Sequence, residues 1–132
     1  MTYVADTQPL VFYAVGATEK LGRKAIRVFG QAERRQATVH IPTACFFELA
    51  LLLESGKVRT ALPFLEWKAQ VEGSGAFIVE PLTWEDIVEA RSLRALVDPF
   101  DRIIAGTANR LRCPLITRDN RITRCRLVAT VW

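Results

Sequence analysis

The apolar residues of the chain fall partly into short continuous runs, which polar residues, prolines or glycines interrupt. Such runs are typical of strands, and the length of each run separates it from a helix. Five segments are predicted to be strands: TYVAD (2–6), ATVHIP (37–42), AFIVEPL (76–82), PLIT (114–117) and RLVATVW (126–132).

The segments between these strands carry the signals of helices. In 18–35, apolar residues recur at roughly helical spacing, and Thr18 suits the helix start. Pro9 opens an apolar segment over 10–17. Gly56 is a natural C-cap, and Thr83 with Asp86 three residues later has the outline of a capping box. Helices are predicted over 18–35, 43–56, 61–73, 83–96 and 97–108.

Strands that alternate with helices predict the fold class. The expected architecture is a three-layer α/β/α sandwich with a mainly parallel central sheet, covered by helices on both faces. The sequence contains no repeat, low-complexity tract or linker, so residues 1–132 are expected to form a single domain.

Composition narrows the class of protein. Half of the residues are hydrophobic and 24% are charged, as in a soluble globular protein. No signal peptide is apparent, and the longest apolar run, 44–53, is too short to cross a bilayer, so we expect a cytoplasmic protein without a membrane partner. Three cysteines without CxxC spacing, and one histidine, indicate reduced thiols rather than a zinc site.

Charge is unevenly distributed along the chain. The net charge is +4, but seven arginines and a single acid, Asp119, lie from Arg102 onward. This arginine-rich end suits binding to a polyanion such as RNA. A solvated basic surface that only keeps the protein soluble explains the charge equally well.

Acidic residues follow or precede several predicted elements. Asp6 ends the first strand, Asp119 lies two residues after PLIT, and Asp98 and Asp101 open a helix. Ligands of open α/β sheets collect beyond the carboxyl ends of the strands, so these acids are expected to share one rim. Asp98 also suits an N-cap, with Pro99 at the first helical position, so its stretch alone does not separate capping from metal binding.

Glu48 is the most informative of the acids. Its neighbours three and four residues away are apolar: Ala44, Cys45, Leu51 and Leu52. A carboxylate on that face must be desolvated, which an ion pair with a core-facing arginine or a bound divalent cation would compensate. Magnesium and manganese prefer such oxygen ligands and suit phosphoryl chemistry. His40 lies inside a predicted strand and is expected to be a core or sheet-surface residue rather than a base, and no Gly-rich phosphate loop occurs.

Four segments, in order, resemble the PIN-domain family, and most closely its VapC-like toxins of type II toxin–antitoxin modules. They are YVADT (3–7), FFELALLLESGKV (46–58), VDPFDRIIAGTA (97–108) and PLITRDNRI (114–122), followed by a terminal TVW. The resemblance covers almost the whole chain. It implies a parallel sheet between helices and a Mg²⁺- or Mn²⁺-dependent endoribonuclease that a cognate antitoxin blocks.

The resemblance also implies roles for individual residues. Asp6 and Asp101 would be the principal metal ligands, and Glu48 and Asp119 would complete the catalytic site directly or through water. Asp98 would mainly cap its helix. Two hydroxyl residues, Thr7 and Thr117, would position a carboxylate or the water.

The resemblance further implies a homodimer. Exposed apolar stripes on the helical segments ALLL (50–53) and LVFYAVGA (10–17) are the expected contact surfaces, and the antitoxin is expected to bind a hydrophobic groove near them. An arginine of the antitoxin would reach the acidic pocket.

Other classes of function fit less well. A receiver domain would need paired acids after the first strand and a late lysine, and a haloacid-dehalogenase-type phosphatase would need an acid where Gln8 stands. A non-catalytic RNA-binding or regulatory module with the same fold remains as the alternative. It would gain nothing from buried carboxylates that repel phosphate, so Glu48 and Asp101 favour the enzyme.

Overall fold

The computed structural model describes all residues, 1–132, and contains one five-stranded sheet. All neighbouring strands are parallel, and their order is β3-β2-β1-β4-β5. The predicted sandwich is confirmed, and the sheet is parallel throughout. The strands are β1 (Thr2–Ala5), β2 (Thr38–Pro42), β3 (Phe77–Glu80), β4 (Leu115–Ile116) and β5 (Thr130–Val131).

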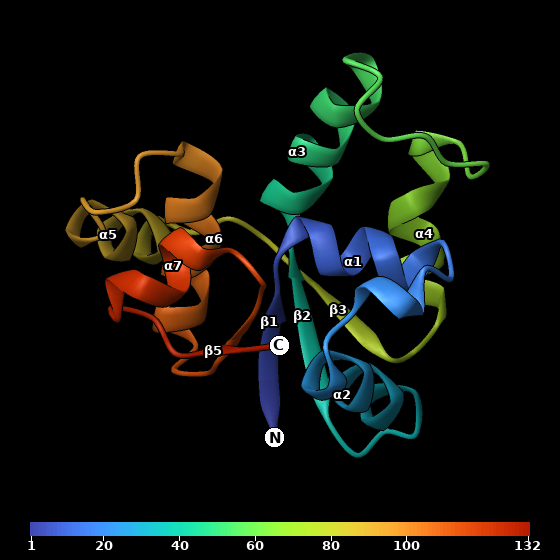
Figure 1. Cartoon of the computed structure of the whole chain (residues 1–132), viewed down its shortest axis with the longest axis horizontal. Helices are drawn as coiled ribbons and strands as arrows, with labels where there is room; N and C mark the ends of the chain where they lie inside the picture. Colours follow the sequence, from blue (N-terminus) through green and yellow to red (C-terminus); the bar gives the residue numbers. More distant parts are fainter.

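Helices cover both faces of this sheet. Figure 1 shows α1, α2 and α4 on one side of the sheet and α5 and α6 on the other. None of the helices is long and apolar enough to cross a membrane. The helices are α1 (Thr7–Ala14), α2 (Arg23–Glu33), α3 (Thr43–Glu54), α4 (Trp67–Gly73), α5 (Trp84–Ser92), α6 (Pro99–Arg110) and α7 (Asn120–Cys125), with 3₁₀ turns η1 (Thr18–Lys20) and η2 (Phe64–Glu66).

Several predicted helix boundaries are wrong, and α4 begins at Trp67 rather than at residue 61, because residues 64–66 form a 3₁₀ turn. Helix α2 begins at Arg23 rather than Thr18, because residues 18–20 form a 3₁₀ turn and Gly22 is extended as the N-cap. Gly22 packs against Trp132 so closely that a Cβ atom would lie 2.3 Å from a backbone carbon. Helix α5 ends at Ser92, four residues before the predicted end, and the apolar segment after Pro9 belongs to a helix, α1, that begins at Thr7.

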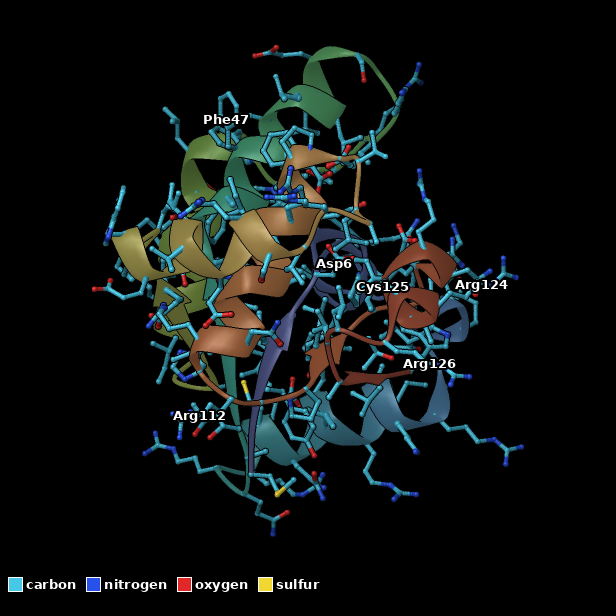
Figure 2. The ribbon with its side chains drawn as sticks, turned by 90° about the vertical axis from the view of Figure 1, so that its left-hand side faces the viewer. Asp6, Phe47, Arg112, Arg124, Cys125 and Arg126 are labelled. Carbon is cyan, nitrogen blue, oxygen red and sulfur yellow. The ribbon has the colours of Figure 1, made fainter.

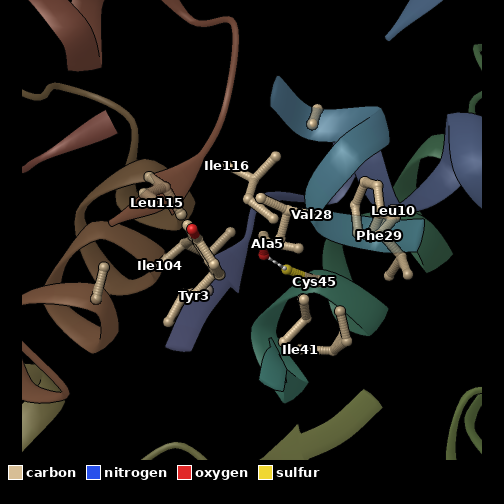
Figure 3. Close-up of a cluster of buried hydrophobic side chains, with 14 of the residues drawn as sticks. Tyr3, Ala5, Leu10, Val28, Phe29, Ile41, Cys45, Ile104, Leu115 and Ile116 are labelled. Atoms are coloured by element: carbon tan, nitrogen blue, oxygen red, sulfur yellow. Dashed lines mark hydrogen bonds between the residues drawn. The ribbon is translucent and has the colours of Figure 1, made fainter. Parts of the chain in front are cut away.

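The core lies on both faces of the central strand β1. Four of its fully buried residues are Val4, Ala5, Ile41 and Leu115. Figure 3 shows Cys45 against this strand, where its Sγ lies 3.5 Å from the carbonyl oxygen of Ala5. Burial raises the pKa of this thiol well above its usual value. All three cysteines are free thiols, and the other two are half-buried.

Helix α6 is fixed at its start and along one side. Asp98 caps it, and its Oδ1 accepts hydrogen bonds from the N–H groups of Phe100 (2.8 Å) and Asp101 (3.1 Å). Farther along, Gly106 touches α5 so closely that a Cβ atom would lie 2.8 Å from the carbonyl oxygen of Asp86. The capping box predicted at Thr83 is present at the start of α5.

A network of ion pairs joins α6 to α5 and to the edge of the sheet. Arg110 binds Asp86 (2.5 Å) and Glu80 (2.6 Å), and the other carboxylate oxygen of Glu80 lies 2.9 Å from Nδ1 of His40. These two carboxylates raise the pKa of Arg110 further above its usual value. His40 is therefore a half-buried sheet residue, as predicted, and is engaged in this network.

Candidate functional site

Asp6 lies where β1 ends and α1 begins, at the carboxyl edge of the sheet. Both of its carboxylate oxygens are bound by protein groups: Oδ1 accepts from the N–H of Thr7, and Oδ2 accepts from the hydroxyl of Thr117, each at 2.8 Å. The residue is only 8% exposed. Burial raises its pKa above the usual value for an aspartate, and the two hydrogen bonds act in the opposite direction.

Thr117 connects two of the acidic residues. Its Oγ1 donates to Asp6 and accepts a hydrogen bond from the N–H of Asp119 at 3.1 Å. Asp119 in turn caps α7 through Oδ1, which accepts from the N–H of Arg121 at 2.8 Å. Because Thr117 is buried and directly follows β4, it fixes the spacing between the first and last acid of the chain.

Asp101 is held differently from Asp6. It sits on the first turn of α6, and its carboxylate makes no hydrogen bond within the protein. Burial raises its pKa from 3.8 to about 7, and the negative charges of Asp6, Asp98, Asp119 and Glu48 act in the same direction. This carboxylate therefore lacks the positive partner that would stabilise its charge.

Glu48 projects from α3 and is half-buried, so it is less enclosed than its apolar sequence neighbours suggested. Of these neighbours, Leu51 is 40% exposed, and Leu52 lines a cleft together with Glu48. Glu48 forms no ion pair with any arginine. Burial raises its pKa above the usual value, and the negative charges of Asp6 and Asp98 act in the same direction.

The structure brings these acids together in one cleft of about 450 Å³. Asp98 does not line it, but lies near enough to raise the pKa of Asp101. Thr117 does not line the cleft either, but it donates a hydrogen bond to Asp6, which does. The lining residues are almost all polar: Asp6, Thr7, Gln8, Glu48, Leu52, Asp101, Arg118, Asp119, Asn120 and Arg121.

Arg118 and Arg121, the cationic part of this lining, were predicted only as members of the arginine-rich end from Arg102 onward, not as residues of this cleft. Arg118 and Arg121 each lie within two residues of Asp119, so their positions beside a site acid were the available signal. Helix α7, which carries Arg121, was not predicted, because its six residues bury only Ile122. The cleft thus combines an acidic floor with two arginines.

The donors of the cleft suit a divalent cation. The hydroxyl oxygen of Thr7 is buried in the protein without a hydrogen-bond partner, and carboxylate oxygens are the ligands that Mg²⁺ and Mn²⁺ prefer. No three of the carboxylates are close enough together to bind one ion directly. A magnesium ion commonly uses one or two carboxylates and keeps several waters, and this spacing is compatible with that arrangement.

Comparison with protein families gives one match that spans nearly the whole chain. The model of the PIN domain matches residues 3–126. No curated protein matches the sequence.

Solved structures of low sequence identity share the fold. VapBC2 from Rickettsia felis, bound to a DNA fragment from its promoter, matches with a TM-score of 0.71 and 13% identity, over 99% of this chain and 98% of that one. FitAcB from Neisseria gonorrhoeae matches with a TM-score of 0.65 and 15% identity, over 98% and 96%. VapBC-1 from nontypeable Haemophilus influenzae matches with a TM-score of 0.64 and 12% identity, over 99% and 97%.

Proposed function

The chain belongs to the PIN domain family, and from this premise we propose that it is a metal-dependent endoribonuclease. The observation that carries the proposal is the convergence of four acids, from four separate segments, in one polar cleft. The raised pKa values of Asp6, Glu48 and Asp101 support it, because burial, and to a lesser degree the neighbouring negative charges, disfavours their ionised forms in the absence of a cation. A site for RNA binding alone would gain nothing from this crowding.

Each residue has a defined part in the proposed site. Asp6 and Asp101 would hold Mg²⁺ or Mn²⁺, and Glu48 and Asp119 would bind its waters. The ion, when bound, would activate a water and neutralise the phosphate that is attacked. Thr117 keeps the Asp6 carboxylate oriented and holds the backbone of Asp119.

Incubation with total RNA and magnesium tests this function. The wild-type protein should cut RNA. EDTA and the Asp6→Asn substitution should each reduce the rate at least 100-fold, because EDTA removes the metal ion and the substitution removes a negative charge that would hold it. RNA left uncut by the wild-type protein in magnesium and in manganese would contradict the proposal.

The alternative function is a non-catalytic RNA-binding or regulatory module. The exposed arginines at the cleft would serve this function as well as they would serve the nuclease. Titration of the protein with Mg²⁺ or Mn²⁺ separates the two functions. Only the nuclease needs to bind such an ion, and Asp101→Asn should weaken that binding. RNA binding without any metal-dependent stabilisation would favour the alternative.

We further propose that the protein is the toxin of a toxin–antitoxin pair. The structures it resembles include a toxin–antitoxin complex from Klebsiella pneumoniae, with a TM-score of 0.62. A cleft of about 610 Å³ between α1 and the segment before α4 would accept the antitoxin; Val15, Leu62 and Trp67 line it. Expression of the wild-type chain alone should arrest growth, whereas Asp101→Asn should not.

The proposed homodimer would use, besides the predicted segment 50–53, in which Leu51 is 40% exposed, an apolar surface that was not predicted. In segment 10–17, Leu10 and Val11 are buried, and of the large apolar residues only Val15 is exposed. The apolar cleft between α5 and α6 is instead lined by Ile87, Val97, Pro99 and Ile103 among others. The exposed ring of Phe47, which Figure 2 shows at the end of the molecule opposite Arg112, extends this surface through its contact with Phe100.

A further inference from the structure

Arg118 is held at the edge of the acidic cleft without a salt bridge. Its Nε donates to the side-chain oxygen of Gln8 at 2.9 Å, and its guanidinium carbon lies 5.2 Å from the centre of the Phe12 ring. Both partners are uncharged, although four carboxylates line the same cleft. The guanidinium is therefore oriented by α1 while its charge stays available to an anion.

A second cation shares the same aromatic ring. The Nζ of Lys20, from the η1 turn, lies 5.5 Å from the centre of the Phe12 ring. Lys20 is exposed and makes no salt bridge either. Phe12 is half-buried and packs against the core, and its ring is the contact that Arg118 and Lys20 share.

We propose that Arg118, Phe12 and Lys20 form a track that binds the backbone phosphates of single-stranded RNA beside the acidic cleft. The track rests on the proposed nuclease function, because it supplies the positive charge that the acidic floor of the cleft lacks. Successive phosphates of a strand that leaves the cleft over α1 would meet Arg118 first and Lys20 second. Contact through phosphates alone makes the track independent of base sequence.

Single-stranded binding sites in other proteins combine the same two components. A groove of basic residues follows the backbone, aromatic rings stack on the bases, and arginine cation–π contacts add affinity. An acidic peptide would suit the cations of the track but would be repelled by Glu48, Asp101 and their neighbours in the adjoining cleft. A metal-loaded nuclease site accepts a phosphate there, so RNA fits both surfaces at once.

Fluorescence anisotropy with a labelled 12-nucleotide single-stranded RNA tests the track. The Asp101→Asn protein serves as the non-cleaving parent, and Arg118→Gln and Lys20→Gln are each added to it. Each substitution should weaken binding about fivefold to tenfold and lower the slope of log K against log salt by about 0.7. Arg118→Lys should bind with intermediate affinity, because it keeps the charge but loses the bond to Gln8.

Arg124→Gln provides the matched control. Arg124 belongs to α7, is exposed and does not line the cleft; Figure 2 shows it on the outer side of that helix from Asp6. The control should bind within twofold of the parent.

Two results would overturn the track. One is equal weakening by Arg124→Gln and Arg118→Gln, since net charge alone would then explain the loss of affinity. The other is failure of the parent to bind RNA. If wild-type protein leaves RNA uncut while the Arg118 effect persists, the nuclease function fails and the track stands.

Discussion

At the residue scale, the acids of the cleft differ in how the protein supports them. Asp6 is bound by two hydrogen bonds and Asp119 caps a helix, whereas Asp101 has no partner for its carboxylate. Functional sites hold charged groups at positions where they do not stabilise the fold. Asp101 is therefore the residue at which stability and proposed activity oppose each other.

Replacing Asp101 by Asn should stabilise the metal-free protein above neutral pH. The folded-state pKa of about 7 exceeds the usual 3.8, so the native state binds the proton more tightly. Its stability then falls as pH rises from about 4 to about 7, and the substitution removes this loss. Solvent screening of the half-buried group reduces the gain to about 1–2 kcal/mol.

Thermal unfolding without divalent ions, at pH 5 and at pH 8, measures the effect. The Tm difference between Asp101→Asn and the wild-type protein should be larger at pH 8. Glu19→Gln, which removes an exposed acid with no ion-pair partner, should change neither Tm. A variant less stable than the wild-type protein at pH 8 would show that the charge of Asp101 is compensated.

Individual site residues were predictable where a charged residue has apolar neighbours or directly follows a predicted strand. Asp6 follows a strand and Glu48 has apolar neighbours, and both signals are local. For Arg118, the position beside Asp119 was a local signal, but its orientation was not predictable, because its partners Gln8 and Phe12 lie about 110 residues earlier in the chain. The roles of the acids in metal binding stay predictions until an ion is observed.

At the element scale, the side-chain caps of α5 and α6 were predicted, whereas those of α1 (Asp6) and α7 (Asp119) were not, and neither was a start set by a tertiary contact. Asp98 and Thr83 begin α6 and α5 through hydrogen bonds to residues two or three positions away. The start of α2 depends instead on the contact of Gly22 with Trp132, at the other end of the chain. The periodicity of apolar residues along the chain gives no information about a contact between residues so far apart in sequence.

The approach of α5 to α6 gives a prediction about packing. In Gly106→Ala, the new Cβ would meet backbone atoms of Asp86 and Ala90, at 2.8 and 3.1 Å, so the helices must move apart. The free energy of unfolding should fall by about 1–2 kcal/mol, because overpacking outweighs the better helix propensity of alanine. Urea denaturation measures this change.

Gly30→Ala is the control for the same substitution in a helix. Its Cβ would have only the flexible end of Arg34 nearby, at 3.4 Å, so propensity should dominate and stabilise the protein by about 0.5–1 kcal/mol. Equal effects at both glycines would contradict the close packing of α5 and α6.

At the scale of the whole molecule, the parallel sheet explains why distant acids meet. Every strand runs in the same direction, so residues that follow β1 and β4 emerge at the same edge, which is the upper edge in Figure 1. The alternation of strands and helices made this edge predictable from sequence. The apolar face over α5 and α6 was not, because it depends on which helix sides remain uncovered.

That face predicts the oligomeric state. The wild-type protein should give a dimeric mass in light scattering at micromolar concentration, because Val97 (90% exposed) and its neighbours would otherwise remain in water. Val97→Lys should shift the mass toward the monomer. Leu65→Lys, at an equally exposed apolar residue on η2, should leave it unchanged. A monomeric wild-type protein would refute the proposed dimer.

The central claim is that the acidic cleft binds a divalent cation. Crystals soaked in manganese chloride, with diffraction data collected near the manganese absorption edge, test it most directly. The account predicts an anomalous density peak between the carboxylates of Asp6 and Asp101, absent in Asp101→Asn crystals. Diffraction data of equal quality without a peak at these carboxylates would contradict it.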